Sequence, residues 1–90
     1  MKLSDFTGKP CRSKLAYEFL PNKKTQLDLK KEAEALKKEH YIDVESKVLL
    51  ILHVEGKTVS LFQSGKILVR GERDEKEARK VAEKVIKCLE

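Results

Sequence analysis

The sequence predicts an α+β fold, a curved antiparallel sheet of about five strands with two helices on one of its faces. Apolar residues recur with a helical period in residues 26–39 and again from Ala78 to the C-terminus. Between these stretches lie short apolar segments separated by glycine-containing turns, which predict consecutive hairpins. Hairpin-linked strands are antiparallel, and one-sided helices leave the other face of such a sheet open.

The predicted order is strand, helix, four strands, helix (β-α-β-β-β-β-α). Apolar residues alternate in the first strand, and Pro21 ends it. Thr25 and Asp28 resemble a capping box for the first helix, and Asp74 and Glu77 resemble one for the second. The predicted strands are residues 14–20, 41–44, 47–55, 58–62 and 66–70, with turns at Gly56-Lys57 and Ser64-Gly65.

Length and charge predict one small basic domain. The 90 residues divide into a basic flexible arm (1–12) and a single domain (13–90), and the net charge is +5. Residues 1–31 hold eight basic and three acidic residues, whereas residues 32–90 hold twelve of each. An excess of positive charge at one end attracts polyanions. The Lys- and Glu-rich composition without tryptophan is typical of heat-adapted proteins.

Several classes of protein are excluded by what the sequence lacks. There is no apolar run of about 18 residues and no signal peptide, so we expect a cytoplasmic chain in a reducing compartment, without membrane contact. The two cysteines and two histidines lack the paired spacing of a zinc site, which predicts no metal and no cofactor. These four residues are Cys11, His40, His53 and Cys88.

The sequence also argues against an enzyme or a small-molecule substrate. Its serines lie near no evident His/Asp constellation, and His53 has no identifiable acid partner. Gly65-Lys66 is a hairpin turn and lacks the spacing of a phosphate-binding loop. We therefore predict no catalytic residue.

The alternation of strand residues predicts an apolar patch on the face without helices. The core face is uniformly aliphatic: Val48, Leu50, Leu52, Val54, Val59, Leu61, Ile67 and Val69. The opposite face holds Lys47, Leu49, Ile51, His53, Thr58, Ser60, Phe62, Lys66, Leu68 and Arg70. Burying a large apolar side chain stabilises by roughly 1.5–3 kcal/mol, so an apolar patch with a basic border indicates a binding or oligomer surface. Alternatively, the arm covers this face with Leu3 and Phe6.

The segment Ser60-Leu-Phe-Gln-Ser-Gly-Lys-Ile-Leu-Val-Arg-Gly71 resembles the central motif of the repeat from which TATA-box-binding proteins are built. The resemblance implies a half-saddle whose open sheet lies on the DNA minor groove, with Phe62 in an intercalating position. This chain departs from the family pattern in four ways. Lys47 stands at the position of a second phenylalanine, Arg70 replaces a threonine, the asparagine of the first strand has no clear counterpart, and one repeat is present where the family has two.

We therefore predict a non-catalytic nucleic-acid-binding protein that uses the open face as a homodimer resembling the two-repeat saddle. The predicted contacts are Lys47, Leu49, Ile51, His53, Ser60, Phe62, Lys66, Leu68 and Arg70, with Lys9, Arg12, Lys14, Lys23 and Lys24 as a basic arm. The alternative is a protein-interaction module of the transcription or DNA-repair machinery that uses the same face. Asp43, Glu45 and Glu55 favour this alternative because they repel a polyanion.

Overall fold

The computed structural model describes residues 2–11, 16–71 and 74–89. Within these ranges the chain forms one antiparallel sheet of six strands in the order β1-β2-β6-β5-β4-β3. The elements are η1 (Leu3–Asp5), β1 (Phe6–Cys11), β2 (Ala16–Pro21), α1 (Leu29–Leu36), β3 (Tyr41–Glu45), β4 (Leu49–Val54), β5 (Lys57–Phe62), β6 (Ile67–Arg70) and α2 (Glu75–Ile86).

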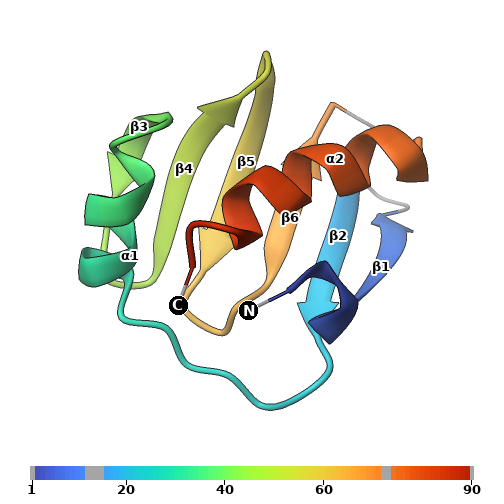
Figure 1. The fold of residues 1–90 in the computed structure, drawn as a ribbon, viewed down its shortest axis with the longest axis horizontal. Coiled ribbons are helices and arrows are strands. Elements are labelled where there is room, and N and C mark those ends of the chain that lie inside the picture. The colour runs from blue at the N-terminus through green and yellow to red at the C-terminus, as the bar shows by residue number, and fades with distance from the viewer. Residues whose placement is uncertain (1, 12–15, 72–73, 90) are drawn as a thin grey trace.

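Helices α1 and α2 lie on the same face of the twisted sheet, α1 beside β3 and β4 and α2 across the remaining strands (Figure 1). The predicted α+β class and element order are therefore confirmed from β2 onward. The expected count of about five strands was wrong, because residues 6–11 form a further strand, β1, that pairs with β2 along its whole length.

Strand β1 places the N-terminal apolar residues beneath α2. Phe6 is buried in the core, and Leu3 packs against the same cluster. Phe6 stands opposite Pro21, and Gly8 stands opposite Phe19, whose ring is fully buried among the core residues. The alternative in which Leu3 and Phe6 cover the opposite face was therefore wrong, because both pack on the side that carries the helices.

The core lies between the sheet and the helices, and alternation along each strand builds it. Leu50, Leu52, Val59, Leu61 and Ile67 are fully buried on the helix side, as the sequence predicts. The helices contribute apolar residues at helical spacing, namely Leu29, Ala33, Leu36, Ala78, Val81, Ala82, Val85 and Ile86. At roughly 1.5–3 kcal/mol for each large side chain, this burial is what holds the helices on the sheet.

Val48 was predicted to lie in the core but is 60% exposed. The Ser46 hydroxyl explains the difference, because it accepts from the backbone N–H of Val48 (3.3 Å) and of Leu49 (3.1 Å) and donates to the Leu49 carbonyl (2.9 Å). These bonds form a tight turn over residues 46–48 that delays the start of β4 to Leu49. Val48 therefore stands in the turn, outside the alternation of the strand.

Helix α1 is shorter than the predicted 26–39. The Thr25 hydroxyl donates to the carbonyl of Lys23 (2.9 Å), so it does not cap the helix. Asp28 is the N-cap instead, and its carboxylate accepts from the backbone N–H of Lys31 (3.4 Å). The segment before it is tied to the sheet, because the N–H of Leu27 donates to the carbonyl of Gln63 (2.8 Å).

Helix α2 begins where the acidic cap predicts. Asp74 is its N-cap and accepts from the backbone N–H of Lys76 (2.9 Å), whereas Glu77 lies in the first turn. The helix was expected to reach the C-terminus, but it ends at Ile86 with Lys87 as the C-cap. The residues after it turn back towards the end of α1.

Candidate nucleic-acid interface

The face of the sheet opposite α1 and α2 is called here the helix-free face. Strand pairing aligns its side chains in rows, one of which runs from Val44 through Ile51, Ser60 and Leu68 to Glu18. A second row places Leu49 directly opposite Phe62. These rows bring together residues from five strands, and they include five of the nine contacts that the sequence predicts on the sheet.

Phe62 stands at the end of β5 as a half-buried ring. The Lys66 ammonium lies 5.4 Å from the centre of that ring, within the range of a cation–π contact. The turn between β5 and β6 fixes this pair, since the N–H of Phe62 donates to the carbonyl of Lys66 (2.9 Å). The predicted wedge residue and the predicted phosphate-binding lysine are therefore immediate neighbours.

Glu18 holds two cations at the β1–β2–β6 side of the helix-free face. Its carboxylate lies 3.5 Å from Lys9 Nζ and 3.3 Å from Lys66 Nζ, and its side chain is only 15% exposed. The three charges sum to one positive charge. In the free protein the two lysines are thus partly neutralised, and an approaching phosphate has to compete with Glu18 for them.

Small or well-packed side chains form the floor of the face. Ser60 is only 1% exposed although no helix covers it, because the Ile51 and Leu68 side chains stand on either side. Leu68 is itself buried, whereas Ile51 and Leu49 are half-buried. A largely apolar floor of this kind is a candidate surface for contact with a flat partner.

The β3–β4 side of the face has a different character. The Tyr41 ring is 67% exposed and stacks on His53, with a centroid separation of 5.7 Å. A bulge between Ile42 and Val44 sets the Asp43 carboxylate 3.7 Å from His53 Nε2. Val44 is 42% exposed beside them. This side therefore combines exposed apolar surface with negative charge.

The remaining predicted contacts lie around the rim. Arg70 is exposed at the end of β6, opposite Thr58. Lys47 is exposed in the turn before β4, where it lines a groove of about 810 Å³ beside the start of α1. Lys23 and Lys24 are exposed in the connection between β2 and α1. Arg12 and Lys14 lie outside the described residues, so their part in the predicted basic arm is not placed.

Among the described residues, the helix-free face includes several that the sequence prediction did not name as contacts, notably Glu18, Leu20, Tyr41 and Val44. The signal for the first two was present, because Tyr17 and Phe19 alternate as core residues and so direct Glu18 and Leu20 to the other side. Tyr41 and Val44 were hidden by the bulge in β3, which places both on one face despite their odd spacing.

An antiparallel sheet with two helices on one face and an open second face has the architecture of a half-saddle domain. A family model described as "Transcription factor TFIID (or TATA-binding protein, TBP)" matches residues 22–90, well over half of the chain. The chain therefore belongs to the TATA-binding protein family, of which it carries a single repeat. No curated protein and no solved structure matches it. Within the described residues, neither α1 nor α2 has the length and apolar character needed to cross a bilayer.

Proposed function

We propose that this chain is a non-catalytic nucleic-acid-binding protein that uses its helix-free face, and that it acts as a homodimer. The observation that carries the proposal is the position of Phe62, a half-buried ring on that face between Leu49 and the Lys66 ammonium. A ring so placed can stack on a base or wedge between two base pairs, while the cation beside it reaches a phosphate.

The family membership supports a DNA-binding or transcription-related role. Charge supports it as well, because Lys9, Lys66 and Arg70 lie on one side of the face and Lys23 and Lys24 lie in the adjoining connection. The single repeat supports a homodimer, because a second copy would supply the second half of a saddle. The short apolar floor then doubles in length along the nucleic acid.

The test is fluorescence anisotropy with a labelled duplex and a labelled single strand, at about 50 and about 200 mM salt. Light scattering on the same samples gives the mass of the free and bound protein. We expect binding that weakens steeply with salt and a complex that contains two chains. Absence of binding at the lower salt concentration overturns the proposal.

A second candidate, a protein-interaction module, rests on the β3–β4 side of the face. Tyr41, Val44 and Val48 are the exposed large apolar residues of the described chain, and Asp43 lies beside the first two. Exposed aromatic and aliphatic side chains next to a carboxylate fit a basic protein partner better than a polyanion. Retention of the chain by such a partner, abolished by Tyr41→Ala and unaffected by Phe62→Ala, would support this candidate.

A further inference from the structure

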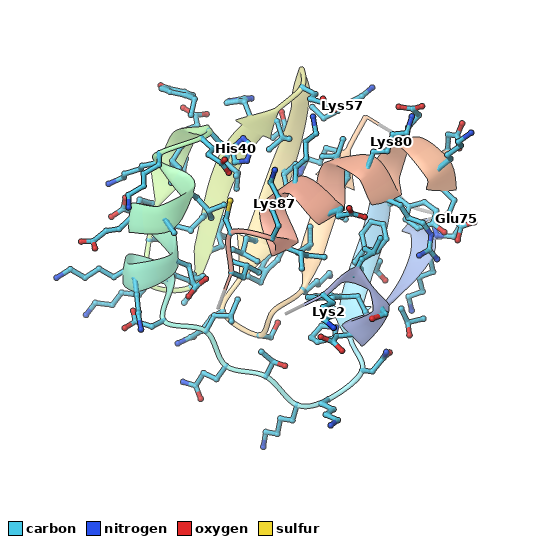
Figure 2. The ribbon with its side chains drawn as sticks, in the orientation of Figure 1. Lys2, His40, Lys57, Glu75, Lys80 and Lys87 are labelled. Carbon is cyan, nitrogen blue, oxygen red and sulfur yellow. The ribbon has the colours of Figure 1, made fainter. Side chains whose placement is uncertain are left out.

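The chain that leaves α2 returns to the turn that follows α1, on the helix side of the sheet. Cys88 lies two residues beyond the end of α2, and Glu39 and His40 lie in the turn between α1 and β3. The Cys88 thiol donates to Glu39 Oε2 (3.0 Å) and lies 3.6 Å from the Lys84 carbonyl oxygen. Figure 2 shows His40 at the end of α1, near the chain that passes through Lys87.

One ligand atom from each of Glu39, His40 and Cys88 lies within 4.8 Å of the other two. A thiolate, an imidazole and a carboxylate are the three side-chain types that bind Zn²⁺, at roughly 2.3, 2.0 and 2.1 Å. Tetrahedral angles at those bond lengths separate ligand atoms by about 3.3–3.6 Å. The cluster therefore has to close by only about an ångström, which side-chain rotation in a surface turn can supply.

The imidazole of His40 gives a second, independent indication. Its Nε2 atom is shielded from solvent and has no hydrogen-bond partner among the residues that the structure describes. A shielded polar atom without a partner is unfavourable, and such atoms in native proteins call for an explanation such as an ion or a water molecule. A cation bound through Nε2 and the Cys88 sulfur would satisfy this nitrogen and replace the thiol proton that Glu39 now accepts.

We propose that Glu39, His40 and Cys88 form a binding site for one divalent transition-metal ion, with Zn²⁺ as the natural occupant. Glu39 is exposed, so solvent reaches the site and supplies the fourth ligand. The site lies on the helix side of the sheet, away from Phe62, and its failure leaves the proposed nucleic-acid binding untouched. The bound ion joins the end of the chain to the α1–β3 turn and stabilises the folded state.

The test is titration of the reduced, untagged chain with Co²⁺, whose thiolate charge-transfer and visible bands report a four-coordinate site that contains sulfur. We expect one equivalent to bind, and Zn²⁺ to bleach the bands. Cys88→Ser and His40→Ala should abolish the charge-transfer band. Cys11→Ser is the matched control, because it removes the other cysteine of the chain, which lies in β1, and it should retain the full spectrum.

Thermal unfolding gives a second readout. Zn²⁺ at about a hundred times its Kd should raise Tm by roughly 10 °C or more in the wild type and leave Cys88→Ser unchanged. If that variant fails to fold, alkylation of the wild-type chain tests the site instead. Bound Zn²⁺ should slow the reaction of Cys88 with iodoacetamide, as measured by mass spectrometry of the peptide that contains Cys88. A Cys88→Ser protein that keeps the Co²⁺ spectrum overturns the proposal, as does unprotected alkylation of Cys88 at saturating Zn²⁺.

Discussion

The helix-free face has two halves that differ in charge although they share one sheet. The basic half, on β1, β2, β6 and the turn that precedes β6, carries Lys9, Lys66 and Arg70 around a single carboxylate, Glu18. The acidic half, on β3 and β4, carries Tyr41, Asp43, Val44 and His53. Ser60 and Phe62 on β5 lie between them. A polyanion approaching the face is drawn to the first half and repelled by the second, so one surface can hold two kinds of partner.

The largest expected effect is that of Phe62→Ala on DNA affinity. Loss of one base–aromatic stack costs about 1–3 kcal/mol, which weakens binding roughly 5- to 150-fold. Tyr41→Ala is the matched control, because Tyr41 is the exposed aromatic of the acidic half. Anisotropy titrations of both variants provide the measurement. Equal losses for both would show that the two halves bind DNA as one surface.

Glu18→Gln should strengthen DNA binding. The substitution removes a negative charge and releases Lys9 and Lys66, which now share the carboxylate. One such interaction near a surface amounts to about 1 kcal/mol, so affinity should rise roughly fivefold at low salt. Asp43→Asn removes the same charge from the acidic half and should have a smaller effect. A fall in affinity for Glu18→Gln would mean that Glu18 positions the lysines for the ligand.

Arg70→Gln should lower the salt dependence of binding. If Arg70 neutralises one phosphate, the slope of log affinity against log salt falls in magnitude by about 1. The control variant is Lys38→Gln, which removes an exposed positive charge from the turn after α1, on the helix side of the sheet. Titrations at four salt concentrations give both slopes. An unchanged slope for Arg70→Gln would remove this residue from the interface.

Val44→Asp tests the acidic half of the helix-free face, as Glu18→Gln and Arg70→Gln test the basic half. We expect DNA affinity to stay within about twofold, because the added charge lies in the acidic half, several strands from Lys66. The same charge on the exposed edge strand β3 should lower the dimer fraction seen by light scattering, if copies pair through this edge. A loss of DNA affinity as large as that of Phe62→Ala would contradict the division of the face.

The smallest expected effect is on the pH dependence of stability. A hydrogen bond donated by Lys84 lowers the pKa of Glu55 below its usual range, so this carboxylate contributes stability at any pH above its unfolded-state pKa. That contribution is lost as the pH falls through the lower folded-state pKa. Urea midpoints at about pH 6 and about pH 3 should differ less for Glu55→Gln than for the wild type. Identical differences would show that the Glu55–Lys84 pair does not contribute to folding.

The sequence predicted the elements and the two faces of the sheet wherever local patterns decide them. Alternation placed Leu50 and Leu52 inside and Ile51 outside, as the structure confirms. Strand β1 was missed because Gly8 and Pro10 read as loop residues. Both suit this strand for reasons that depend on its neighbour: proline is tolerated at a sheet edge, and a Cβ on Gly8 would lie 2.7 Å from the Phe19 ring.

The sequence predicted the candidate site only in part, because some of its contacts join strands that are far apart in the chain. The neighbourhood of Phe62, Ser64, Gly65 and Lys66 is local, and the motif located it. The neutralising role of Glu18 depends on strands β1, β2 and β6 lying side by side, which brings Lys9 and Lys66 to one carboxylate from far apart in the chain. The cluster of His40 and Cys88 likewise arises from tertiary packing.

The strand that residues 6–11 add to one edge lengthens the spacing in a sheet doubled through that edge, and so makes the two edges unequal. Two copies joined edge to edge through β3 would separate their β5 strands by five strand intervals, about 24 Å, or roughly seven base steps at 3.4 Å each. Joined through β1, the same strands would stand seven intervals apart, about 34 Å, or roughly ten steps. The distance between the two Phe62 side chains along a duplex would therefore distinguish a dimer joined through β3 from one joined through β1.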